Sequence, residues 1–214
     1  MKPVRTIVFA KAPIAGFAKT RLIPALGAQG AADLAQRMLQ HTLSTALRAQ
    51  VGPVELCVSP SHSDPVWQRF EIPETVAWSD QADGDLGARM ARAAQRSLAR
   101  GEAVILIGTD CPDLTVAMLQ VATQDLTAYD ACMVPTADGG YCLLGLQHFA
   151  MALFEAMPWS TPAVAALTLQ RLKQLNWQVK VHPTLHDIDE PADLQWLPAN
   201  WGYAGTAAPE TAQV

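Results

Sequence analysis

The most constraining feature of this chain is a near-continuous apolar run at residues 104–108 (VILIG), which polar residues follow at once. A run this short and this apolar is typical of a central strand of a parallel sheet, because both faces of such a strand are buried. Similar runs occur before and after it, and stretches with helical periodicity separate them. This alternation predicts a single α/β domain, with a mostly parallel central sheet and helices on both faces.

The expected elements follow from the spacing of apolar residues and from the Gly, Pro and Arg residues at their ends. The expected strands are residues 6–10, 54–59, 104–108, 131–135, 141–146 and 178–182. The expected helices are residues 31–50, 86–100, 114–126 and 161–175. We expect the domain to span residues 1–203, and the small and polar residues 204–214 to form a disordered tail.

Length and charge limit the classes of function. The chain has 214 residues, of which 50% are hydrophobic, and this is ample for one continuous core. Its net charge is −5 and it has no cluster of Lys and Arg, so a nucleic-acid partner is not expected. Four cysteines without CxxC spacing favour reduced thiols over a zinc site or disulfides. With no signal peptide or membrane span in the pattern, we expect a cytoplasmic protein that acts on small molecules.

The loop after the first expected strand reads KAPIAGFAKTR over residues 11–21. Backbone N–H groups and cations in such a loop suit a phosphate, although a solvated basic loop is the alternative. It is not a Walker A loop, because Pro13 and Ala18 stand where that motif needs glycine. Ligands of these sheets bind outside the carboxyl ends of the strands, which favours phosphate binding. The candidate phosphate-binding residues are Lys11, Pro13, Gly16, Lys19, Thr20 and Arg21.

Asp110 follows the central strand directly, within the sequence GTDCPD. A carboxylate at the tip of a buried strand is costly unless a cation or several donors meet it. Mg²⁺ or Mn²⁺ fits, because these ions take one or two carboxylates together with phosphate oxygens. Asp110 is therefore a candidate metal ligand. Asp113 is equally well explained as the cap of the next helix.

Two further acidic segments follow later strands. Asp138 lies in an Asp-Gly-Gly sequence that suits a hairpin turn, or alternatively places the carboxylate near a bound acceptor. His186, Asp187 and Asp189 form a compact cluster of possible metal ligands after the last strand. Asp189 can instead cap a helix that starts at Pro191. Both readings can hold if Asp187 points inward.

In this order, these motifs resemble those of a known family over residues 6–197. They are Pro13…Gly16-x-x-Lys19-Thr20-Arg21-Leu22, Gly84-Asp-Leu-Gly87-x-Arg89-Met90, Gly108-x-Asp110-x-Pro112, Asp138-Gly139-Gly140-Tyr141 and Asp187-Ile188-Asp189-x-Pro191. The chain is similar to bacterial GT-A-like nucleotide-diphospho-sugar transferases, including arsenosugar-biosynthesis-type glycosyltransferases, a family once classed as a domain of unknown function. The Lys-Thr-Arg-Leu loop more distantly resembles that of 2-phospholactate guanylyltransferases and molybdenum-cofactor nucleotidyltransferases.

The resemblance implies a GT-A fold with a nucleotide-diphosphate pocket at the first strands. By position, Lys19 and Arg21 would contact phosphates. Gly84, Gly87 and Arg89 would belong to the nucleotide site, where the glycines permit close backbone approach to a ligand, although a simple helix entry loop explains them nearly as well. Asp110 would hold Mg²⁺ or Mn²⁺, and Asp187 or Asp189 would complete the metal site. One departure is that the Asp-x-Asp of GT-A glycosyltransferases reads Gly108-Thr109-Asp110 here.

The expected function is glycosyl transfer from a nucleotide-sugar to a small-molecule acceptor. Asp110 and Lys19 would stabilise the departing diphosphate, and Asp138 would act as general base. The alternative is a nucleotidyltransferase that joins a nucleoside triphosphate to a phosphorylated acceptor and releases pyrophosphate. A third hypothesis is a non-catalytic nucleotide-binding protein, for which Asp138 would have no purpose.

Overall fold

The computed structural model describes residues 2–203, so the expected tail at residues 204–214 lies outside the described residues. Its strands are β1 Val4–Lys11, β2 Val54–Ser59, β3 Ala77–Asp80, β4 Ala103–Ile107, β5 Ala131–Pro135, β6 Tyr141–Leu146 and β7 Val179–Val181. Its α-helices are α1 Ile23–Ala49, α2 Leu86–Ala99, α3 Val116–Asp125 and α4 Val164–Gln174. Short 3-10 helices are η1 Thr20–Leu22, η2 Pro65–Arg69, η3 Met151–Leu153, η4 Pro191–Trp196 and η5 Ala199–Trp201.

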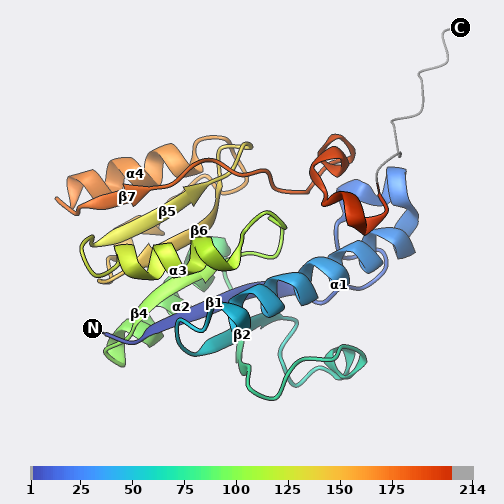
Figure 1. Cartoon of the computed structure of the whole chain (residues 1–214), viewed down its shortest axis with the longest axis horizontal. Coiled ribbons are helices and arrows are strands. Elements are labelled where there is room, and N and C mark those ends of the chain that lie inside the picture. The colour runs from blue at the N-terminus through green and yellow to red at the C-terminus, as the bar shows by residue number, and fades with distance from the viewer. Residues whose placement is uncertain (1, 204–214) are drawn as a thin grey trace, which may run out of the picture.

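The strands form one seven-stranded sheet in the order β3-β2-β1-β4-β6-β5-β7 (Figure 1). Strand β4 lies at its centre, and all five of its residues are buried, as the apolar run predicts. Strand β6 runs antiparallel to both β4 and β5, whereas the other neighbours pair in parallel. The predicted mostly parallel α/β fold is therefore confirmed. Every strand except β6 ends at the same edge of the sheet.

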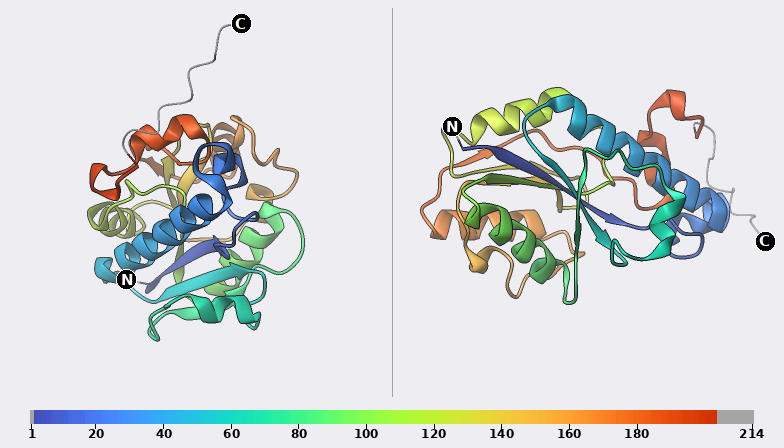
Figure 2. Two further views of the ribbon diagram at one scale, coloured as in Figure 1. Left: turned by 90° about the vertical axis from the view of Figure 1, so that its right-hand side faces the viewer. Right: turned by 90° about the horizontal axis from the view of Figure 1, so that it is seen from below.

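Helices cover both faces of the sheet (Figure 2). Leu39 and Leu43 of α1 pack with Leu119 of α3 in the core on one face. On the other face, Met90 of α2 and Leu172 of α4 pack in a second core. The layers follow from the strands, because residues that alternate along each strand face opposite sides. Among the described residues, no helix is long and apolar enough to cross a membrane.

A third, smaller core attaches the C-terminal segment to α1. Leu34 and Met38 of α1 pack against Ile188, Leu194 and other residues of this segment. In Figure 1 the red segment accordingly lies beside the blue helix. This packing holds residues 186–193 at the edge of the sheet where the strands end.

Two elements differ from the sequence prediction. Helix α1 begins at Ile23 rather than at residue 31, and Gly27 interrupts it with a φ of 71°. Pro24 fits the first turn of this helix, because a proline there loses no helical hydrogen bond. Strand β3 was not predicted. It has four residues, none of them buried, at the edge of the sheet, so it lacks the apolar pattern that reveals a strand.

Candidate functional site

Lys19 is the meeting point of three segments at the carboxyl edge of the sheet. Its ammonium lies 2.5 Å from Asp110 Oδ1 and 2.7 Å from Asp189 Oδ1, and it donates to the Ile188 carbonyl at 2.6 Å. An ammonium has three hydrogen-bond donors, so these partners engage all of them. Burial lowers the pKa of Lys19, but Asp110 and Asp189 outweigh it, and the net pKa is raised. Lys19 is therefore charged and held in place.

The loop that carries Lys19 turns its cations in different directions. Lys19 adopts the left-handed conformation with φ 46° and points inward, where its side chain is 9% exposed. Lys11 and Arg21 are exposed at the two ends of the loop. Pro13 is buried, and Gly16 has a φ of 83° at the exposed turn between them. This arrangement leaves two cations of the loop accessible to an anionic ligand.

Asp110 follows β4 and is joined to the C-terminal segment through its backbone. Its carbonyl accepts from the Ile188 N–H at 2.8 Å, and the thiol of Cys111 donates to the His186 carbonyl at 3.2 Å. The Asp110 carboxylate remains half exposed. Asp110 therefore stands at the open edge of the sheet with one oxygen bound to Lys19.

Asp138 lies in the turn between β5 and β6, as the hairpin interpretation predicts. Its Oδ1 accepts from the Thr136 hydroxyl at 2.6 Å and from the Gly140 N–H at 2.8 Å. Gly139 has a φ of 90°, and a Cβ there would lie 2.2 Å from the Pro162 carbonyl oxygen. The turn is therefore fixed on both sides, and so is the position of Asp138.

Asp187 comes close to Asp138 because two chain segments run in parallel just before them. Thr136 and Leu185 form an isolated parallel bridge, and the Ala137 N–H donates to the Leu185 carbonyl at 2.9 Å. Burial, and then the charge of Asp138, raise the pKa of Asp187 to about 6. The Asp-Gly-Gly sequence therefore forms a hairpin turn and also brings the Asp138 carboxylate close to Asp187. The two interpretations of this sequence are compatible with each other.

These carboxylates surround a cavity of about 320 Å³. Its walls are Arg21, Ala137, Asp138, His186, Asp187, Asp189, Glu190 and Asp193. The ring of His186 stacks on Trp196, with 3.9 Å between centroids and 7° between planes. Arg21 is 4.0 Å from Glu190, and both side chains are 64% exposed. The cavity is therefore strongly acidic, with one aromatic wall.

The segment at residues 81–90 is held by its own side chains. Gln81 is buried and donates to the carbonyls of Ala10 and Cys57, at 3.0 and 3.1 Å. The predicted nucleotide-site residue Arg89 donates to the Gly84 carbonyl at 2.9 Å and to Gln81 Oε1 at 3.2 Å. Gly84 has a φ of 103°, which favours glycine. These bonds tie the loop to the ends of β1 and β2.

Gly87 has a packing role that the sequence did not reveal. A Cβ at this position would lie 2.3 Å from the Phe154 carbonyl and 2.7 Å from Trp159 Nε1. The first turn of α2 therefore approaches the neighbouring segment so closely that only glycine fits. This contact explains Gly87 without a nucleotide, so its ligand-binding role stays a prediction.

Two predicted helix caps are wrong. Helix α3 begins after Thr115, whose hydroxyl accepts from the Met118 N–H, while Asp113 is exposed. Before η4 the cap is Glu190, which forms a capping box with Asp193, whereas the Asp189 side chain binds Lys19. In both places the cap lies one or two residues after the predicted one, a shift that spacing alone does not resolve.

The predicted metal ligands are near one another but do not form a complete cage. Among residues 2–203, no three His, Cys, Asp or Glu side chains stand close enough together to hold a metal ion. Asp110 and Asp189 share the Lys19 ammonium instead, and Asp187 neighbours Asp138. Magnesium sites commonly use one or two carboxylates and take their remaining oxygens from substrate phosphates and water. Two carboxylates with ligand oxygens and water would therefore be enough for a site of that kind.

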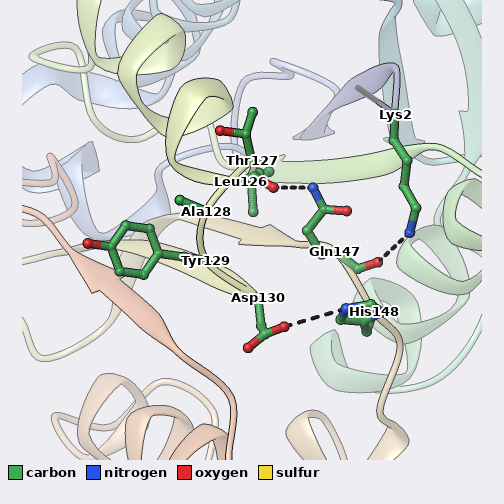
Figure 3. Close-up of a pocket in the computed structure, with 8 residues that line it drawn as sticks. All are labelled: Lys2, Leu126, Thr127, Ala128, Tyr129, Asp130, Gln147 and His148. Carbon is green, nitrogen blue, oxygen red and sulfur yellow. Dashed lines mark hydrogen bonds and ion pairs between the residues drawn. The ribbon is translucent and has the colours of Figure 1, made fainter.

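A second hollow, of about 530 Å³, lies at the opposite edge of the sheet (Figure 3). Its polar groups mostly bond to one another: Lys2 donates to the Gln147 carbonyl, Gln147 donates to the Leu126 carbonyl, and His148 lies 3.5 Å from Asp130. Ligands of open α/β sheets bind at the carboxyl ends of the strands. The smaller acidic cavity is therefore the candidate site.

Sequence reasoning missed three contributors to the site. The Ile188 carbonyl binds Lys19, Gln81 anchors the loop beside β1, and Trp196 supports His186. A backbone carbonyl has no sequence signature, and Trp196 lies in a segment without a readable period. Gln81 comes directly after the short strand β3, so recognising that strand in the sequence would have drawn attention to it.

Comparison with known proteins places this geometry in a family. The family model described as an uncharacterized protein conserved in bacteria, DUF2064, matches residues 42–161. The chain belongs to this family. No curated protein matches this DUF2064 member.

Solved structures share the fold of this DUF2064 protein. A candidate nucleotide-diphospho-sugar transferase from Desulfovibrio desulfuricans G20 is 29% identical, with a TM-score of 0.86 over 96% of this chain and 90% of the other. The 4-diphosphocytidyl-2C-methyl-D-erythritol synthase of Anaerococcus prevotii DSM 20548 is 12% identical, with a TM-score of 0.60 over 94% and 98%. Rv0371c of Mycobacterium tuberculosis H37Rv, in complex with manganese, is 15% identical, with a TM-score of 0.51 over 92% and 98%. The predicted nucleotide-diphospho-sugar transferase fold is confirmed.

Proposed function

We propose that this protein is a metal-dependent glycosyltransferase that moves a sugar from a nucleotide-sugar donor to a small acceptor. The observation that carries the proposal is the buried Lys19 ammonium, which binds Asp110 and Asp189 where the strands end. It brings a phosphate-type loop and two carboxylates to one point. The similarity to the candidate nucleotide-diphospho-sugar transferase of Desulfovibrio desulfuricans supports the same reaction class.

The donor diphosphate would lie between the first loop and Asp110. Lys11 and Arg21 are exposed and can contact phosphate oxygens, together with backbone N–H groups of the loop. Lys19 adds positive charge beside them while it fixes Asp110 and Asp189. Segment 81–90, with Gly84, Gly87 and Arg89, would flank the nucleoside.

Asp110 and Asp187 would hold the Mg²⁺ or Mn²⁺ ion, which when bound supplies neutralising charge for the departing diphosphate. Asp187 is preferred to Asp189 as the second ligand because it lines the cavity outside the Lys19 ion pairs, whereas Asp189, like Asp110, already shares that ammonium. Asp138 would act as the general base. Its Oδ1 accepts from Thr136 and Gly140, which fixes the carboxylate, and its other oxygen would take the proton of an acceptor hydroxyl.

The test is Asp110→Ala, assayed for release of nucleoside diphosphate from a panel of nucleotide-sugars with Mn²⁺. We expect loss of turnover and of metal-dependent nucleotide binding, whereas Asp113→Ala, at an exposed carboxylate nearby, should keep both. Circular dichroism would show that both variants are folded. Metal-dependent binding that survives in Asp110→Ala would rule out the assignment.

The second candidate is nucleotidyl transfer. The single carboxylate of Gly108-Thr109-Asp110, in place of Asp-x-Asp, favours it. In that reaction an acceptor phosphate attacks the α-phosphate of a nucleoside triphosphate, and Lys19 and Arg21 lie beside the triphosphate. Pyrophosphate release from nucleoside triphosphates with phosphorylated acceptors would identify this reaction. Nucleoside diphosphate release from nucleotide-sugars would identify the first.

A further inference from the structure

The acidic cavity offers its occupant almost only hydrogen-bond acceptors. Five of its eight lining residues carry carboxylates, namely Asp138, Asp187, Asp189, Glu190 and Asp193. An ionised carboxylate accepts hydrogen bonds and cannot donate them. Arg21 and His186 are the lining side chains that can donate. A molecule that fits the cavity must therefore bring donors of its own.

The cations near the cavity do not balance these carboxylates. Arg21 is 64% exposed and stands 4.0 Å from Glu190. The three N–H donors of Lys19 bind Asp110, Asp189 and the Ile188 carbonyl. A divalent ion held by Asp110 and Asp187 would still leave Asp138, Glu190 and Asp193 around the remaining space. A phosphate group on the occupant would add negative charge where negative charge is already in excess.

The His186 ring, which lines the cavity, helps to decide which class of donor-rich molecule fits it. His186 lines the cavity, and its ring stacks on Trp196. A flat ring offers a face to C–H groups, and the carboxylates beside it accept from hydroxyls, a pairing that suits a polyol or sugar. The volume of about 320 Å³ lies near the lower end of small-molecule sites, which span roughly 300 to 1,000 Å³.

We propose that the acceptor of this enzyme is an uncharged, hydroxyl-rich small molecule rather than a phosphorylated one. This inference rests on the proposed function, since it names the acceptor of the same site. It assigns Glu190 and Asp193 a new role: they exclude phosphorylated molecules while accepting hydrogen bonds from hydroxyls.

Binding of matched pairs tests the proposal without turnover. Ligand-observed NMR on the Mg²⁺-loaded protein would compare monosaccharides and sugar alcohols with their own monophosphates, at constant ionic strength. We expect uncharged members to bind at least about tenfold more tightly, which is the effect of one unfavourable charge pair near a surface. The proposal fails if the monophosphates bind as tightly, or if no uncharged member binds.

Glu190→Gln tests the assigned residue. The change removes one charge and keeps the size of the side chain and one acceptor oxygen, while the other oxygen becomes an NH₂ donor. We expect affinity for the monophosphates to rise about tenfold, and affinity for uncharged members to change little. Glu74→Gln, at an exposed carboxylate outside the cavity, is the matched control and should change neither. Equal behaviour of the two variants would overturn the role of Glu190.

Turnover separates this inference from the function on which it rests. Release of nucleoside diphosphate from a nucleotide-sugar with monophosphate acceptors alone would keep the transferase and overturn the acceptor class. If no acceptor leads to release of nucleoside diphosphate, the proposed glycosyltransferase activity is overturned. The NMR comparison would then still show whether the cavity prefers uncharged or phosphorylated molecules.

Discussion

At the scale of single residues, Lys19 has the most demanding surroundings of the site. Lys19→Met keeps the apolar stem and removes the charge, so Asp110 and Asp189 lose their shared counter-ion. We expect the free energy of unfolding to fall by about 1 to 3 kcal/mol, below the cost for a fully buried pair because both carboxylates are partly exposed. Urea titration measures it. Lys11→Met, at the exposed end of the same loop, should cost less than about 0.5 kcal/mol. Equal effects would contradict the structure.

Asp187 should make the stability of the folded protein depend on pH. Its pKa in the folded protein is raised from 3.8 to about 6 by burial and by neighbouring carboxylates. A raised carboxyl pKa means that stability is full below pH 4 and is lost as the pH rises toward 6, because the folded state disfavours the charged form. Asp187→Asn should therefore stabilise the metal-free protein at pH 7.5 by about 1 kcal/mol, a value reduced for solvent screening.

The measurement for Asp187 is urea unfolding in a chelator at several pH values from 4 to 7.5. The gain from Asp187→Asn should be absent at the acidic end and constant above pH 7. Asp113→Asn, at an exposed carboxylate, is the control. A gain that does not vary with pH would show that the charge of Asp187 is not its source.

At the scale of elements, the turn between β5 and β6 depends on Gly139. Gly139→Ala adds a Cβ at 2.2 Å from the Pro162 carbonyl, in a backbone conformation with φ 90°. We expect a loss of about 2 to 4 kcal/mol from the combined strain and clash. Gly101→Ala is a matched control, since Gly101 has a φ of 79° but nothing within 4 Å, and should cost about 1 kcal/mol. Chemical denaturation of both variants separates clash from backbone strain.

Much of this architecture could be predicted from the sequence because the strands that build the core are apolar on both faces. Strand β4 is buried throughout, and its run of apolar residues marks it clearly. The antiparallel direction of β6 follows from a short turn, which brings the chain straight back beside β5. Strand β3 and the first turns of α1 could not be predicted. Their stability comes from contacts with β2 and with the C-terminal segment, not from a local pattern.

The sequence predicted at which edge of the sheet the candidate residues lie, but not which partners they contact. Sheet topology places the residues after each strand at one edge, so Asp110, Asp138 and Asp187 could be placed there in advance. The pairing of Lys19 with Asp189 could not, since it joins residues 170 positions apart. The helix caps were wrong for a similar reason, because several residues able to cap stood close to each helix start and only the final geometry selects one.

At the scale of the whole molecule, ligand binding should raise stability by mass action. At a ligand concentration of about 100 times Kd the gain is about 2.7 kcal/mol. For a chain of this length that corresponds to a rise in Tm of roughly 5 to 10 °C. We expect this rise with a nucleoside diphosphate or nucleotide-sugar plus Mn²⁺, and not without the metal. A thermal-shift screen measures it.

Two controls make the screen decisive. The Asp110→Ala variant should show no metal-dependent rise, while Asp113→Ala should behave as the natural chain does. If no nucleotide or nucleotide-sugar raises Tm, the transferase hypotheses and the non-catalytic binding hypothesis all fail.

The reach of Lys19 across the chain has a consequence for biosynthesis. The lysine leaves the ribosome early, but the carboxylate of Asp189 and the carbonyl of Ile188 emerge 170 and 169 positions later. A nascent chain can pair β1 with β2 and β4 well before then. The unfinished protein thus lacks the contact between Lys19 and Asp189, and the candidate site is complete only when the segment with Asp189 docks.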